Sequence, residues 1–187
     1  MELIGTVVAL QVQRSPLKPG PASTRVYDPA PLQPVVALDV GPRGCVGTAA
    51  DGERVLDVHH ADHPSSRNNR LANGLSFMTL AGYADLRQTY GEHLVDGIAG
   101  ESVLLDGELP LTGELRVEMV GGSLLLTALL AAAPCVEFTR FCLRREPGAV
   151  DDEVLAALEG LGDGARGSYA TATGDGVVRA GARVWRA

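Results

Sequence analysis

The chain has 187 residues, of which 45% are hydrophobic and 21% charged, a balance typical of a single globular domain. Its formal net charge of −7 argues against nonspecific binding to nucleic acid, which needs a basic surface. The longest apolar run, residues 123–134, is too short to cross a bilayer, and the N-terminus lacks the basic residues of a signal peptide. We therefore expect one cytoplasmic domain over residues 1–187, without a membrane segment.

The first half of the chain consists of short apolar segments separated by turn-forming residues. The proline-rich segment 15–34 predicts a surface loop, residues 41–47 a glycine turn and residues 61–74 a polar loop. Residues 79–91 predict a helix that ends at Gly91. β-branched or alternating apolar residues predict strands at 3–13, 35–40, 53–60 and 75–80.

The second half continues this pattern and contains the clearest helix. Alternation in 113–121 predicts a half-buried strand, and the glycines before 122–130 favour a strand there too. Residues 151–162 predict a helix with acidic residues at its start. Residues 167–186 predict two short strands around a tight turn. Many short strands without regular helical crossovers predict a mainly β protein, a closed or nearly closed β-barrel, rather than a parallel βαβ fold.

Five segments in chain order resemble the MOSC domain, which occurs at the C-terminus of molybdenum cofactor sulfurases and as stand-alone bacterial proteins. They are 5–10, 35–47, 74–107, 120–138 and 165–184, and the fourth contains a Pro-Cys pair at Pro134 and Cys135. The resemblance implies a β-barrel of MOSC type over the whole chain. It also implies that Cys135 carries sulfur as a persulfide, or binds the molybdenum of a pterin cofactor as in relatives that reduce N-oxygenated small molecules.

The chain departs from the family pattern at three positions. Thr48 and Ala182 stand where the family often has aspartate, and Ser102 stands in a Gly-Glu-Asn-like motif in place of asparagine. Each change removes a polar group, and Thr48 and Ser102 are expected near the site. A non-catalytic binding module with a degenerate site is therefore an alternative to retained family chemistry.

Both roles of Cys135 require a thiolate, because a neutral thiol is a poor nucleophile and a poor soft ligand. Arg140, Arg144 and Arg145 lie close enough in sequence to favour the anion. The alternative is an inert buried cysteine, which is the commonest fate of free cysteines and the reading we prefer for Cys142. The odd number of cysteines predicts reduced thiols rather than disulfides.

A molybdenum–pterin cofactor also carries phosphate, which an acidic protein has to bind with a local basic patch. We expect Arg67, Arg70 and Arg166 to supply it. The resemblance adds Glu101 and Ser102 of the Gly-Glu-Asn-like motif to the candidate cofactor contacts, and Arg140 is the last candidate.

Pyridoxal phosphate catalysis needs a lysine, and Lys18, the sole lysine of the chain, lies in the proline-rich segment. We therefore expect no pyridoxal phosphate in this chain. A partner, such as a cysteine desulfurase, would then supply any sulfur.

Residues 57–63 gather five side chains that suit zinc or iron. If a strand runs through His59, then Asp57 and His59 share one face. The spacing matches no specific metal motif, so a polar loop is the alternative to a metal-dependent enzyme that uses His59, His60 or His63.

Overall fold

The structure is a computed structural model that describes residues 1–22, 24–66, 74–108 and 111–187. Seven strands form a closed barrel in the order β1-β12-β8-β9-β10-β6-β7, and β7 pairs with β1 to complete the ring. The mainly β, closed-barrel fold expected from the sequence is confirmed. The strands are β1 (Glu2–Gln13), β6 (Leu75–Thr79), β7 (Val103–Leu105), β8 (Leu115–Met119), β9 (Gly122–Ala131), β10 (Ser168–Ala172) and β12 (Arg183–Arg186).

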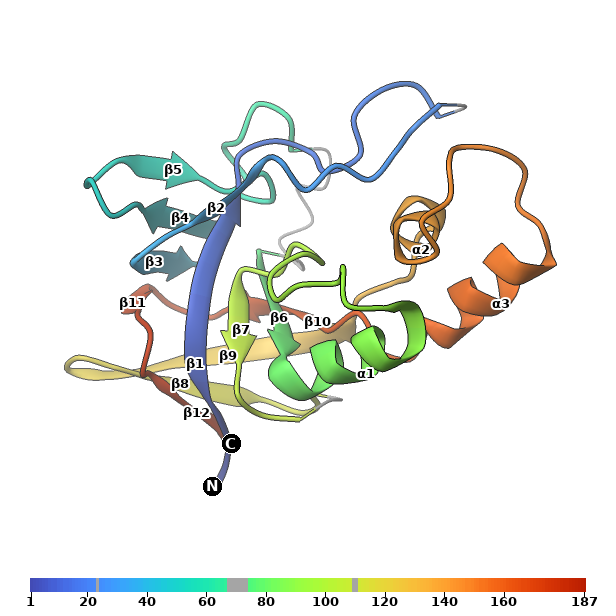
Figure 1. Cartoon of the computed structure of the whole chain (residues 1–187). Coiled ribbons are helices and arrows are strands. Elements are labelled where there is room, and N and C mark those ends of the chain that lie inside the picture. The colour runs from blue at the N-terminus through green and yellow to red at the C-terminus, as the bar shows by residue number, and fades with distance from the viewer. Residues whose placement is uncertain (23, 67–73, 109–110) are drawn as a thin grey trace.

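A second, antiparallel sheet lies at one end of the barrel (Figure 1). Its order is β11-β3-β4-β5, from β3 (Ala37–Gly41), β4 (Gly44–Thr48), β5 (Arg54–Leu56) and β11 (Gly176–Val178), and the short β2 (Leu32–Pro34) pairs with the end of β1. Apolar side chains of the two sheets share one core, in which Leu38 and Cys45 of the second sheet join Phe77 and Leu126 of the barrel. Burial of this shared apolar surface holds the sheets together.

The βαβ connection is the main difference from the expected topology. β6 and β7 are parallel, and α1 (Leu80–Tyr90) connects them. The Thr79 hydroxyl accepts a hydrogen bond from the Gly82 N–H at the start of α1, and Gly91 ends the helix with φ 113°. Parallel neighbours need a crossover, and this helix supplies it.

Two sequence expectations about turns are wrong. The glycine turn predicted at 41–47 is confined to residues 42–43, because β4 begins at Gly44. The predicted C-terminal pair is not a hairpin: β10 pairs with β9 and β6, whereas β11 pairs with β3 in the other sheet. Both strands form, but the turn between them leads the chain from one sheet to the other.

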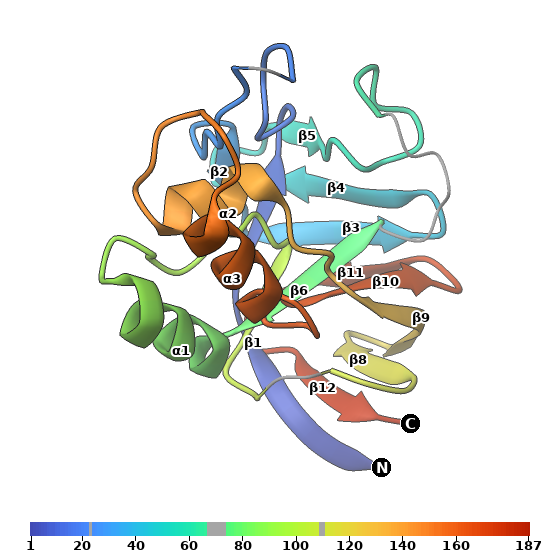
Figure 2. The ribbon, with the colours of Figure 1, turned by 90° about the vertical axis from the view of Figure 1, so that its right-hand side faces the viewer.

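The helices lie together on one side of the molecule, as Figure 2 shows. They are α1, α2 (Val136–Cys142) and α3 (Asp152–Gly160). At the start of α3, Asp151 accepts a hydrogen bond from the Val154 N–H, as the sequence predicts for a helix start. Within the described ranges, every helix is shorter or less apolar than a bilayer-spanning helix has to be.

A second core fills the space between α1, α2 and the proline-rich loop at residues 14–31. Tyr27 of this loop packs against Phe138 and Phe141 of α2, with ring centroids 5.0 and 5.2 Å apart. Met78 and Tyr83 are fully buried in the same core. The loop is thus fixed against α2, and this contact closes one side of the pocket described next.

Candidate functional site

A pocket of about 820 Å³ lies beside this second core. Segments that are far apart in sequence line it. They are the proline-rich loop, the turn after β5, the start of β6, the segment before β7, and the segments before α2 and β10. The volume is in the range of pockets that hold a cofactor or a drug-sized molecule.

Cys135 lies on the pocket wall immediately before α2. Its side chain is half-buried, and one Arg166 nitrogen, Nη1, is 3.4 Å from its Sγ. The same nitrogen donates to the Ala133 carbonyl oxygen at 3.1 Å, and the guanidinium lies 4.3 Å from the centroid of the Phe138 ring. The contacts with Ala133 and Phe138 therefore hold a permanent positive charge beside the sulfur.

The other two cysteines are unsuited to chemistry. Cys45 is fully buried, and burial together with the nearby Asp57 raises the pKa of its thiol. Burial raises the pKa of Cys142 to about 12, although the Arg166 charge acts in the opposite direction. Both side chains pack in the hydrophobic cores, as expected for structural cysteines.

Glu101 is a buried carboxyl group in the pocket wall, with 4% of its surface exposed. Its Oε2 accepts a hydrogen bond from the Tyr83 hydroxyl at 2.8 Å, and that hydroxyl in turn accepts from the Ala99 N–H at 2.9 Å. The other oxygen, Oε1, is buried and has no hydrogen-bond partner among the described residues. Burial raises the pKa of Glu101 to about 7, although the Tyr83 hydroxyl favours the anion.

A carboxylate–imidazole pair lies at another part of the wall. Asp57 is buried and accepts hydrogen bonds from the Gln13 N–H and the His59 N–H, both at 2.8 Å, and its Oδ1 lies 2.9 Å from His59 Nδ1. A carboxylate acceptor places the imidazole proton on Nδ1 and leaves Nε2 as an acceptor. The His59 ring lies beside Tyr169, with centroids 6.4 Å apart. Burial raises the pKa of Tyr169, and the nearby Arg166 guanidinium acts in the opposite direction.

The charge of the pocket is opposite to that of the whole protein. Among the described residues, its charged lining consists of three cations, Lys18, Arg25 and Arg166, and one carboxyl group, Glu101. Arg25 is half-buried, and its nearest carboxylate, on Glu137, is 3.9 Å away. A pocket lined in this way attracts an anion despite a net charge of −7.

Comparisons with known proteins support the fold and are silent about the chemistry. No protein-family model matches the chain, and no curated protein matches its sequence. The crystal structure of the YuaD protein from Bacillus subtilis is similar over 97% of this chain and 94% of that one, with a TM-score of 0.57 and 13% identity. A second structure, of a hypothetical protein, is similar over 98% of this chain and 68% of that one, with a TM-score of 0.56 and 12% identity. At these identities the likeness concerns the fold.

Four of the residues singled out from the sequence line this pocket: Cys135, Arg166, Glu101 and His59. Ser102 does not; it is buried behind the wall, where its N–H donates to the hydroxyl of the lining residue Ser76. Thr48 is also elsewhere, on β4, where its hydroxyl accepts from Arg54. Neither Thr48 nor Ser102 therefore places a side chain on the described pocket wall.

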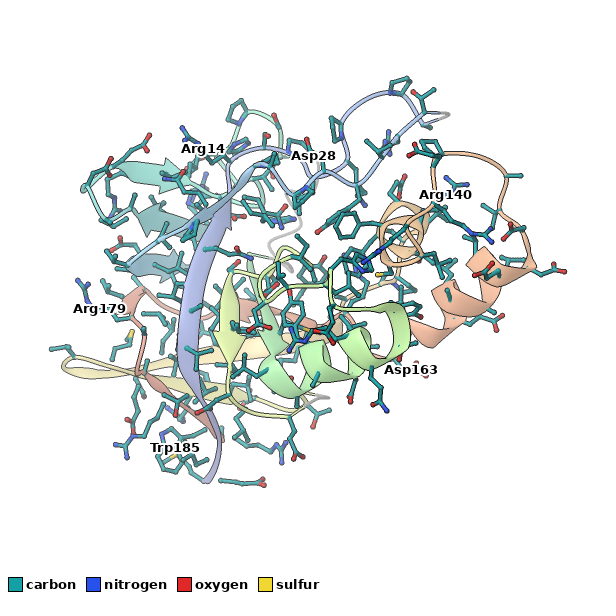
Figure 3. The ribbon with its side chains drawn as sticks, viewed as in Figure 1. Arg14, Asp28, Arg140, Asp163, Arg179 and Trp185 are labelled. Carbon is teal, nitrogen blue, oxygen red and sulfur yellow. The ribbon has the colours of Figure 1, made fainter. Side chains whose placement is uncertain are left out.

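The arginines near Cys135 in sequence are not its partners in space. Arg140 points toward the loop after α2, where it donates to the Gly148 carbonyl, and Figure 3 labels it there. With Arg144 and Arg145 it lines a separate hollow of about 370 Å³. Arg67 and Arg70 lie outside the described residues.

The histidine cluster differs from its sequence expectation. β5 ends at Leu56, so Asp57 and His59 meet through a turn and not as neighbours on a strand face. His60 and His63 accept through Nδ1 from the N–H groups of Asp62 and Ser65. In the described ranges no group of three histidine, cysteine or acidic side chains is placed to hold a metal ion.

Sequence reasoning missed the residues that the proline-rich loop brings to the pocket. Lys18, which the sequence placed in a surface loop, lines the pocket with Arg25 and Tyr27. A proline-rich stretch predicts a loop but not where the loop packs. Arg25 and Tyr27 are recognised as pocket residues only from the structure, in which Tyr27 packs against Phe138 of α2. The sequence contains no signal for this contact.

The Arg166 contact gives a direct prediction about Cys135 reactivity. In Arg166→Gln we expect iodoacetamide to modify Cys135 about fivefold more slowly at pH 7, because the variant loses the positive charge 3.4 Å from the Sγ, and a half-exposed charge contact of this kind contributes about 1 kcal/mol. The measurement is the pseudo-first-order rate from peptide mass spectrometry. Arg140→Gln is the matched control, since Arg140 contacts the Gly148 carbonyl and not the sulfur. Equal rates in both variants and the wild type would disprove the role of Arg166.

Proposed function

We propose that this protein is a cytoplasmic MOSC-type protein that handles sulfur through Cys135. The observation that carries the proposal is the Arg166 guanidinium 3.4 Å from the Cys135 Sγ, on the wall of a cationic pocket. The three unpaired cysteines, all within the described residues, suit a reducing compartment.

The proposed reaction is a persulfide transfer. The Cys135 thiolate attacks the terminal sulfur of a donor persulfide, a new S–S bond forms at Cys135, and the S–S bond of the donor breaks. The donor leaves as a thiolate, so the charge passes from Cys135 to the donor and no external oxidant or reductant is needed. Arg166 holds the attacking anion, and it holds the Cys135 persulfide anion after the departing donor thiolate has taken up the persulfide proton. A cysteine desulfurase is a suitable donor of this kind.

The same residues fit a molybdenum–pterin cofactor, which is the second role that the MOSC resemblance implies. Cys135 offers a soft sulfur ligand, Lys18, Arg25 and Arg166 offer cations for a phosphate, and the pocket volume of about 820 Å³ is sufficient. When bound, such a cofactor would supply two-electron redox chemistry. The contribution of this chain would be to bind the phosphate, hold the sulfur as an anion and line the pocket with aromatic rings.

The test is the mass of the protein after incubation with a persulfide donor such as glutathione persulfide. We expect the wild type to gain the mass of one sulfur atom, located on the Cys135 peptide, and Cys135→Ser to gain none. Cys142→Ala is the matched control and should be labelled like the wild type, because Cys142 is 1% exposed.

Molybdenum and pterin content of the purified protein separates the two roles. Retention of either in the wild type and its loss in Cys135→Ser would assign the cofactor role. Wild-type protein that neither takes up sulfur nor retains molybdenum or pterin would refute the proposal and favour the non-catalytic module.

A further inference from the structure

The cations of the pocket wall outnumber its anions, and they are not all engaged within the protein. Lys18 is exposed and forms neither an ion pair nor a hydrogen bond within the described residues. Arg166 contacts the Ala133 carbonyl oxygen and the Cys135 sulfur through Nη1, whereas its Nη2 is accessible and has no hydrogen-bond partner in the described part of the chain. The pocket therefore keeps cationic N–H donors that are free to bind a ligand.

Lys18 and Arg25 belong to a loop whose backbone is held in place on both sides. The Asp28 N–H donates to the Leu17 carbonyl oxygen at 2.8 Å, which joins the two arms of the loop, and Leu17 itself is buried. The Tyr27 ring packs against α2. Both cations lie within two residues of these anchors, so the loop holds them at the pocket wall.

An excess of positive charge around a thiolate suits a sulfur donor that is itself an anion. A thiolate and an anionic donor repel each other, and the breaking of the donor's S–S bond places further negative charge on the leaving group. Cations fixed around both reactants reduce this repulsion and stabilise the leaving group as its charge develops. A donor without a charge of its own gains less from them.

We propose that this site also takes sulfur from a small sulfane-sulfur anion of the thiosulfate class, and that Lys18 and Arg25 determine this specificity. The inference rests on the proposed function in one respect, the use of Cys135 as the group that accepts sulfur.

The step balances without a further reactant. The Cys135 thiolate attacks the outer sulfur of thiosulfate, a new S–S bond forms at Cys135, and the S–S bond of thiosulfate breaks. The electron pair of that bond leaves with the inner sulfur as sulfite. The products are the Cys135 persulfide anion and the sulfite dianion, so the total charge is unchanged and no proton is transferred. The pocket of about 820 Å³ is larger than thiosulfate requires and leaves room for an acceptor that later removes the sulfur.

The experiment is incubation of the purified protein with thiosulfate that carries a heavy isotope at its outer sulfur. We expect the labelled sulfur on the Cys135 peptide, measured by mass spectrometry, and sulfite in an equal amount. The comparison donor is the persulfide of 2-mercaptoethanol, whose leaving group has no charge besides the thiolate. The ratio of the thiosulfate rate to the comparison rate cancels any difference in the amount of folded protein.

Three variants test the role of the loop cations through this ratio. In Lys18→Gln and in Arg25→Gln we expect the ratio to fall about fivefold, because the loss of one cation slows an anionic donor more than a neutral one. Arg179→Gln is the matched control, since Arg179 is exposed and does not line the pocket, and its ratio should equal that of the wild type. Raised salt should lower the ratio in the wild type.

The outcomes separate this inference from the proposed function. Transfer of sulfur from persulfides but not from thiosulfate would overturn the inference and leave the role of Cys135 intact. A ratio unchanged in both Lys18→Gln and Arg25→Gln would also overturn it. If neither kind of donor places sulfur on Cys135, the proposed function fails, and the inference fails with it.

Discussion

Gly167→Ala should lower the free energy of unfolding by about 3 kcal/mol or more, because the new side chain would collide with the wall of the barrel. Gly167 adopts φ +87°, and a Cβ at this position would lie 1.9 Å from the Phe77 carbonyl oxygen. That oxygen belongs to β6 in the barrel wall, so it cannot move without disturbing the pairing of β6 with its neighbours. The measurement is chemical denaturation of the variant and the wild type.

Gly121→Ala is the matched control for this prediction. Gly121 has the same φ of +87°, but a Cβ there meets no atom within 4 Å. We expect it to cost only about 1 kcal/mol, from the left-handed backbone alone. Similar losses in the two variants would show that the contact with β6 does not matter.

Gly167 also links the barrel to the site. Its carbonyl accepts a hydrogen bond from the Ala132 N–H at 2.9 Å, and its neighbours Arg166 and Ser168 both line the pocket. A folded population of Gly167→Ala should therefore resemble Arg166→Gln in the slow modification of Cys135, since the guanidinium loses its fixed position.

The second large effect is a pH-dependent stability difference between the wild type and Glu101→Gln. Burial raises the pKa of Glu101 from its ordinary value of 4.5 to about 7, so the folded protein holds this proton more tightly than the unfolded chain does. The associated stability is complete below pH 4.5 and is lost as the pH rises to about 7. Over that window the wild type should lose about 3 kcal/mol relative to the variant.

Denaturation of both proteins at a series of pH values between 4.5 and 8 measures this difference. Glu92→Gln, at an exposed carboxyl group, controls for the loss of a negative charge and should follow the wild type. A constant difference between wild type and Glu101→Gln across the series would contradict a buried carboxyl with a raised pKa.

The sequence is informative where local pattern decides the structure. The alternation in 113–121 and the apolar run that follows become β8 and β9, and the acidic residues before 153 begin α3. The pairing of the strands is harder to predict from the sequence, because it depends on contacts between segments that are far apart in the chain. β10 and β11 are adjacent in sequence yet belong to different sheets, and the residues between them give no indication of this change.

In the candidate site, too, local motifs are predictable from the sequence and contacts between distant segments are not. Cys135 and Glu101 are recognisable from short motifs, and both line the pocket. The cation beside Cys135 could not be predicted in this way. Proximity in sequence favoured Arg140, whereas the fold places Arg166, which is 31 residues away in the chain, next to the sulfur. A short helix turns Arg140 outward, and the segment before β10 runs alongside the start of α2. Side chains from a loop, such as Arg25, become site residues only when the loop packs.

The central claim, that the Cys135 sulfur faces an open and positively lined pocket, is tested most directly by two alkylating reagents of opposite character. Iodoacetate is an anion and iodoacetamide is neutral, and their rates with each cysteine are measured by peptide mass spectrometry on native and on unfolded protein. We predict that native Cys135 reacts before Cys45 and Cys142, and that the ratio of iodoacetate to iodoacetamide rates is higher at native Cys135 than at the same cysteine in the unfolded chain. A Cys135 that reacts only on unfolding, or a ratio no higher than in the unfolded chain, would contradict the claim.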